Sequence, residues 1–109
     1  MNRGKRRRLE TADWKLGSAK EFLGLTDEEE AVIALKLALA RAVREERAKR
    51  QLTQVQLGRL LGSSQSRIAK MEAGDSSVSI DLFVRSLLRM GASRRDLVRW
   101  LARPVRKAA

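Results

Sequence analysis

The stretch from Thr53 to Gly74 constrains the fold of this chain more than any other part of the sequence. It contains two short helical patterns separated by Gly62, and a turn this tight needs a residue that tolerates a positive φ. Gly58, inside the first pattern, would let the two helices approach closely at their crossing. The apolar residues of the two patterns are spaced so that both helices share one core: Leu57, Leu61, Ile68 and Met71. The sequence therefore predicts two short helices packed against each other across a sharp turn.

Capping signals predict the remaining helices. Thr26 and Glu29 form a capping box at the start of a long helix whose first turn is acidic. A hydroxyl residue precedes each later helix, and glycine follows three of them: the caps are Thr53, Ser64, Ser79 and Ser93. Because no alternating strand pattern occurs, we expect a compact all-α fold of about five helices with an extended first helix.

The chain divides into three predicted regions. Residues 1–25 form a flexible basic arm followed by a docking segment, residues 26–103 form the helical domain, and residues 104–109 form a basic tail. The long helix carries two apolar stripes about a third of a turn apart: Val32, Leu35, Leu39 and Val43 on one face, and Ile33 and Leu37 on the other. One stripe suits the core of the domain. The other implies burial by the N-terminal segment, a second copy or another protein.

Composition narrows the classes of function. The 109 residues carry 24 basic and 13 acidic side chains, and a net charge of +11 favours a polyanionic partner. Cysteine and histidine are absent, which excludes thiolate and imidazole chemistry. The acidic run from Asp27 to Glu30 is explained by the helix start. We therefore expect no catalytic residue, no metal site, no cofactor and no small-molecule substrate. Since the apolar run from Ala31 to Ala40 is too short to span a bilayer, we expect a cytoplasmic protein without a membrane partner.

The outer face of the helix that starts after Ser64 combines side chains that suit base edges. Gln65, Ser66 and Lys70 share this face, with Arg67 at its edge. Glutamine pairs with adenine through two hydrogen bonds, serine suits either base type, and lysine reaches guanine. Backbone amides at helix starts bind phosphate. The alternative is a solvated polar face without a ligand.

This stretch resembles the Cro/C1-type (XRE) helix-turn-helix of phage repressors and bacterial regulators. The matching residues are Leu52-Thr53-Gln54, Leu57, Gly62, Ser64-Gln65-Ser66, Ile68, Glu72 and Gly74. The resemblance covers residues 37–101 and implies a lambda-repressor-like fold. It also implies a homodimer that places its recognition helices in the major groove of an inverted-repeat operator of double-stranded DNA.

The resemblance also implies roles for individual residues. Gln65, Ser66 and Lys70 would face base edges, and Gln54 would support Gln65. The expected contacts to the DNA backbone are Gln54, Arg59, Ser64 and Arg67. Arg47 would pair with Glu72 and fasten the first helix of the domain to the recognition helix.

The flanking sequence is similar to HigA-type antitoxins of toxin–antitoxin operons. The residues concerned are Trp14-Lys15-Leu16-Gly17-Ser18, then Glu21-Phe22-Leu23-Gly24-Leu25-Thr26, followed by the acidic helix start. Such proteins neutralise a RelE/HigB-like ribonuclease and repress their own promoter. The resemblance implies toxin or partner contacts at Trp14, Phe22, Leu23, Ile33 and Leu37. Two alternatives stay open, namely a stand-alone Cro/C1-type regulator without a toxin and a protein-interaction module that no longer binds DNA.

Overall fold

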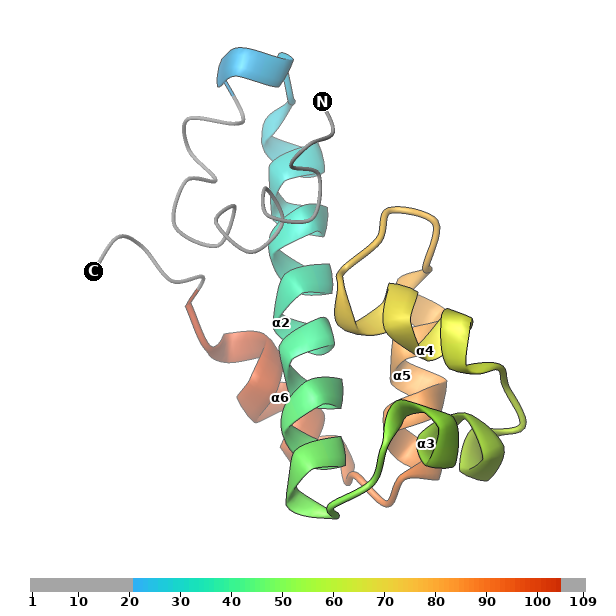
Figure 1. The fold of residues 1–109 in the computed structure, drawn as a ribbon. Coiled ribbons are helices and arrows are strands. Elements are labelled where there is room, and N and C mark those ends of the chain that lie inside the picture. Colours follow the sequence, from blue (N-terminus) through green and yellow to red (C-terminus); the bar gives the residue numbers. More distant parts are fainter. Residues whose placement is uncertain (1–20, 105–109) are drawn as a thin grey trace.

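The structure of the chain is a computed structural model that describes residues 21–104. Over these residues it is helical, with no strand, which confirms the predicted all-α class (Figure 1). The helices α2 to α6 follow one another along the chain: α2 (Asp27–Lys49), α3 (Gln54–Leu61), α4 (Gln65–Glu72), α5 (Ile80–Arg89) and α6 (Arg94–Ala102). Residues 21–23 are also helical and lead into α2.

The long helix α2 starts and ends by different devices. At its start, the Thr26 hydroxyl accepts from the Glu29 amide at 3.0 Å, and the Thr26 amide donates to Glu29 Oε1 at 2.9 Å. This is the predicted capping box, and it satisfies two amides that a helix start otherwise leaves unpaired. At its end, the chain reverses at Gln51, a non-glycine residue with φ 57°. No glycine or proline marks this end in the sequence.

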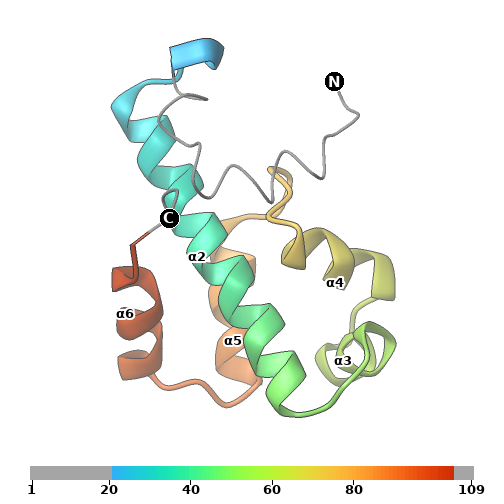
Figure 2. The same cartoon turned by 60° about the vertical axis from the view of Figure 1, so that its left-hand side comes forward.

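The core lies between α2 and the other four helices. α6 packs on one side of α2, and α3, α4 and α5 lie on the other (Figures 1 and 2). The largest fully buried side chains come from every helix except α6: Phe83, Leu39, Leu57, Ile68, Met71, Leu87 and Val43. Helix α6 contributes Leu97 and Trp100, which are also buried. Burial of these aliphatic and aromatic groups is the main source of stability in a bundle of this size.

The predicted turn between α3 and α4 is present, and its glycines have distinct tasks. Gly62 adopts φ 68°, the left-handed conformation that ends α3. Gly58 lies inside α3, but its close neighbour is the turn and not the opposite helix. The Ser63 amide donates to the Gly58 carbonyl at 2.7 Å, and a Cβ built on Gly58 would lie 2.8 Å from the Ser63 carbonyl oxygen. The expectation that Gly58 serves the helix crossing is therefore corrected.

The two apolar stripes of α2 are buried only in part. Leu39 and Val43 are completely buried, but Val32 and Leu35 on the same stripe are exposed. The expectation that this whole stripe enters the core is wrong for its N-terminal half, because this half of α2 extends beyond the other described helices (Figure 1). Leu37 of the second stripe is half-buried against Gly74, where a Cβ would lie 3.1 Å from Leu37 Cδ2.

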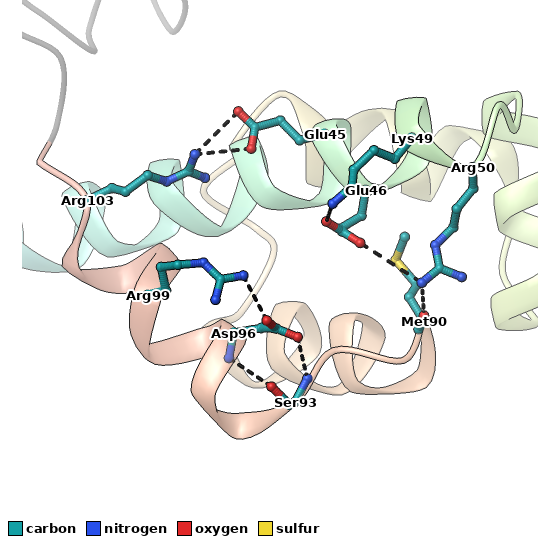
Figure 3. A network of polar contacts seen from close by, with 9 residues as sticks. All are labelled: Glu45, Glu46, Lys49, Arg50, Met90, Ser93, Asp96, Arg99 and Arg103. Atoms are coloured by element: carbon teal, nitrogen blue, oxygen red, sulfur yellow. Dashed lines mark hydrogen bonds and ion pairs between the residues drawn. The ribbon is translucent and has the colours of Figure 1, made fainter.

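Polar contacts fasten the C-terminal half of α2 to α5 and α6 (Figure 3). Arg103 Nη1 lies 3.1 Å from Glu45 Oε1, and the Arg50 guanidinium donates to the Met90 carbonyl. Within α6, Ser93 and Asp96 form the predicted capping box. The pKa of Asp96 is lowered from 3.8 to about 2. The largest cause is the hydrogen bond from the Ser93 backbone amide, and the hydrogen bonds to Arg99 and to the Ser93 hydroxyl contribute less.

Candidate nucleic-acid interface

Helix α4 presents one polar face to solvent and one apolar face to the core. Ile68 and Met71 are buried on the inner side. The outer side carries four exposed side chains, which were predicted from the sequence to lie there: Gln65, Ser66, Arg67 and Lys70. Such a helix can enter a groove with its polar face while its inner face remains packed in the domain.

Ser64 organises the start of α4. Its hydroxyl accepts from the Arg67 amide at 3.1 Å and lies 3.3 Å from the Ser66 hydroxyl. The serine cap therefore occupies one of the free amides of the first turn and leaves others available to an anion. Ser64 itself is exposed, as a contact to a phosphate would require.

A chain of hydrogen bonds supports Gln65 from behind. Gln65 Nε2 donates to Gln54 Oε1 at 2.7 Å, and Gln54 Nε2 donates to Glu72 Oε1 at 3.1 Å. The chain links the first residue of α4 to the first residue of α3 and to the last residue of α4. The structure thus brings Gln54 beside Gln65. Through Gln54, the exposed Gln65 side chain is linked to the buried carboxylate of Glu72.

The carboxylate at the end of this chain is held by Arg47 of α2. Arg47 Nε lies 2.5 Å from Glu72 Oε2, and Arg47 Nη2 lies 2.9 Å from Glu72 Oε1. The Glu72 side chain is 6% exposed and that of Arg47 is 24% exposed. The hydrogen bonds to Glu72 raise the pKa of the Arg47 guanidinium above its ordinary value.

Two further cations of α2 contact the backbone at the end of α4, and sequence reasoning missed both. Arg44 Nη1 donates to the Glu72 carbonyl at 2.6 Å, and Lys36 Nζ donates to the Ser76 carbonyl at 3.1 Å. A signal was present, because Arg44 lies three residues before Arg47 and helical spacing puts both on one face. Helix α2 therefore holds the end of α4 and the loop that follows it.

The remaining predicted site residues lie in two places. Arg59 is exposed on α3, and α3 packs against α4. Phe22 and Leu23 precede α2 and are 85% and 62% exposed, whereas Ile33 and Leu37 are half-buried on α2. Trp14 lies outside the described residues. Exposed Val32 and Leu35, which were expected in the core, extend the apolar surface near the start of α2 beyond the residues expected to contact a partner.

Comparison with known proteins adds a family to this geometry. The family model described as "Helix-turn-helix domain" matches residues 22–93, about two thirds of the chain and all of α2 to α5. Neither the curated proteins nor the solved structures that were compared with the chain gave a match. Over residues 21–104, none of the helices has the length and apolar character that crossing a membrane requires.

Proposed function

The chain belongs to the family of helix-turn-helix domains, and on this premise we propose that it represses transcription by binding a specific DNA sequence. One observation carries the proposal: the polar outer face of α4 is exposed and is held in place by the Gln65–Gln54–Glu72 hydrogen bonds. A solvated face without a ligand does not require such support.

In the proposed complex, a homodimer binds an inverted repeat with its two α4 helices in successive major grooves about 34 Å apart. Gln65, Ser66 and Lys70 contact base edges and supply the specificity. The contacts to phosphates come from Gln54, Arg59, Ser64 and Arg67. The net charge of +11 supplies affinity for any duplex through counterion release. In this proposal the protein acts in the cytoplasm.

The proposal is tested by selection from a duplex library with a randomised central region. The full chain should enrich one inverted-repeat sequence, and Gln65→Ala should lower the affinity for that sequence by about 1–3 kcal/mol. The affinity of the same variant for random duplexes should stay within error, because phosphate contacts dominate there. A chain that enriches no sequence at low salt would contradict the proposal, and equal losses on both duplexes would remove Gln65 from base reading.

We further propose that the regulator is an autoregulating antitoxin that neutralises a RelE/HigB-like ribonuclease. The support is an apolar and acidic surface at the start of α2, away from α4. Phe22 and Leu23 are exposed there, together with Val32 and Leu35 on α2. The first turn of α2 carries the acidic residues 27–30. Such a surface suits a basic partner with an apolar groove, as a ribonuclease that binds RNA would provide.

Deletion of residues 1–25 separates the two activities. The truncated chain should keep its affinity for the selected operator but lose inhibition of the ribonuclease encoded beside its gene. Full inhibition by the truncated chain would exclude this segment as the toxin contact. If no ribonuclease co-purifies from the native operon, a stand-alone regulator becomes the better description. A module that has lost DNA binding is the better description if operator selection fails and a partner protein is captured.

A further inference from the structure

We propose that Glu72, the buried last residue of α4, determines which base Gln65 prefers. Glu72 acts as a positioning residue, because it fixes the orientation of two side-chain amides and does not itself face the DNA. The inference rests on the proposed function and adds a source of specificity to it. The observations are the hydrogen bonds that join Glu72 to Gln54 and Gln54 to Gln65.

The first step is the chemistry of the carboxylate. A carboxylate only accepts hydrogen bonds, and Glu72 accepts two from Arg47. Gln54 must therefore direct its NH₂ group toward Glu72, as it does at 3.1 Å. A flipped Gln54 amide would place two acceptor oxygens against each other. The orientation of Gln54 thus follows from the neighbours of the amide.

The second step passes this orientation to Gln65. Since Gln54 presents its oxygen to α4, Gln65 must direct an N–H toward it, at 2.7 Å. The outer edge of Gln65 is left with one N–H and the carbonyl oxygen. Adenine offers one acceptor and one donor in the major groove, N7 and N6–H, and matches this edge. Guanine offers two acceptors, N7 and O6, so it would need the N–H that Gln54 has taken.

The substitution Glu72→Gln should weaken this selection. Glu72 Oε1 accepts from both Arg47 Nη2 and Gln54, and Glu72 Oε2 accepts from Arg47 Nε. Arg47 only donates, so the new amide sets its NH₂ against an Arg47 donor in either orientation, and the orientation of Gln54 is no longer fixed. With the NH₂ at the Oε1 position, Gln54 donates to Gln65, which then presents two N–H groups, the pattern that guanine accepts. A carboxylate-to-amide change out of reach of the DNA should therefore lower the preference for adenine over guanine at one base pair.

The probe is the duplex that the full wild-type chain selects from a randomised library. The base pair read by residue 65 is the one at which Gln65→Ala loses its preference, and four duplexes that differ only there are compared. We expect the wild-type chain to favour adenine over guanine by about five- to 150-fold, and Glu72→Gln to bring this ratio close to one. All other positions should keep their preferences. Glu46→Gln is the matched control, because Glu46 pairs with Lys49 at 3.2 Å outside this chain of bonds.

Gln54→Met supplies a second variant that keeps the Arg47–Glu72 pair intact. It removes the acceptor behind Gln65 and frees the N–H that guanine needs, so the adenine-to-guanine ratio should fall. Persistence of the adenine-to-guanine ratio in either folded variant would overturn the inference, as would an equal loss at every base pair in Glu72→Gln. If Glu72→Gln lacks the helical circular dichroism of the wild type, Gln54→Met decides alone. A wild-type chain that selects no sequence refutes the proposed function, whereas selection without adenine at this pair refutes only the inference.

Discussion

Removal of the Glu72 carboxylate is the most informative perturbation of the fold. Glu72 accepts two hydrogen bonds from Arg47 and one from Gln54. In Glu72→Ala, the Arg47 guanidinium would keep only its bond to the Leu52 carbonyl, at 2.9 Å. The contact between α2 and the end of α4 would then rest on Arg44 and on apolar packing.

The expected cost follows from the burial of the two groups. Removing one partner of a buried ion pair costs about 3–5 kcal/mol, because the other charge is left without compensation. Since Arg47 is 24% exposed and can gain water, we reduce this to about 2–4 kcal/mol. A domain of this size loses roughly 4–8 °C of Tm for each kcal/mol. Glu72→Ala should therefore lower Tm by about 8–32 °C.

Urea unfolding monitored by tryptophan fluorescence provides the measurement. Trp100 is buried and reports loss of the core, and a Trp14→Phe background isolates its signal. Glu46→Ala is the control, because its partners Lys49 and Arg50 are 73% and 41% exposed and the change should cost below about 1 kcal/mol. The reasoning fails if Glu72→Ala costs no more than this control. It also fails if Arg47→Ala and Glu72→Ala are additive, since a real pair must show coupling in a double-mutant cycle.

Three further predictions address affinity, pH and the core. Arg59→Ala should reduce the slope of log affinity against log salt by about 1 for any duplex, and an unchanged slope would remove Arg59 from the phosphate contacts. The pKa of Asp96 is lowered from 3.8 to about 2, so its stabilisation of α6 should be complete above the ordinary pKa and disappear as the pH falls through the folded value. In Asp96→Asn, the urea concentration at the unfolding midpoint should depend less on pH between these two values. A pH profile of this midpoint identical to that of the wild type would contradict the capping role. Phe83→Ala should cost about 3–5 kcal/mol in urea unfolding because Phe83 is fully buried, and a cost near zero would show that the side chain is not part of the core.

Local signals in the sequence predicted much of the fold. The starts of α2, α3, α5 and α6 follow from a hydroxyl residue whose partner lies three positions later, as in Thr26–Glu29 and Ser93–Asp96. The turn at Gly62 could be predicted because a tight turn requires a residue that tolerates a positive φ. These features depend on neighbours along the chain, so no knowledge of tertiary packing was required.

Features that depend on distant residues were harder to predict. The exposure of Val32 and Leu35 follows from how far α2 extends past its neighbours, which hydrophobic spacing does not reveal. The end of α2 depends on Gln51, a residue type with no strong signal for a left-handed conformation. The bond from Arg44 to the Glu72 carbonyl joins residues 28 positions apart. The Arg47–Glu72 contact was expected only through a family resemblance, because helical spacing alone does not pair two separate helices.

Helix α2 also acts as a spacer. Its 23 residues span about 35 Å at 1.5 Å per residue. Exposed apolar side chains lie in its N-terminal half, and the arginines that contact α4 lie near its C-terminal end. Two large ligands bound at opposite ends of such a rod would not compete for room. Under the proposed function, DNA and a protein partner would therefore bind far enough apart on this molecule that release of one need not precede capture of the other.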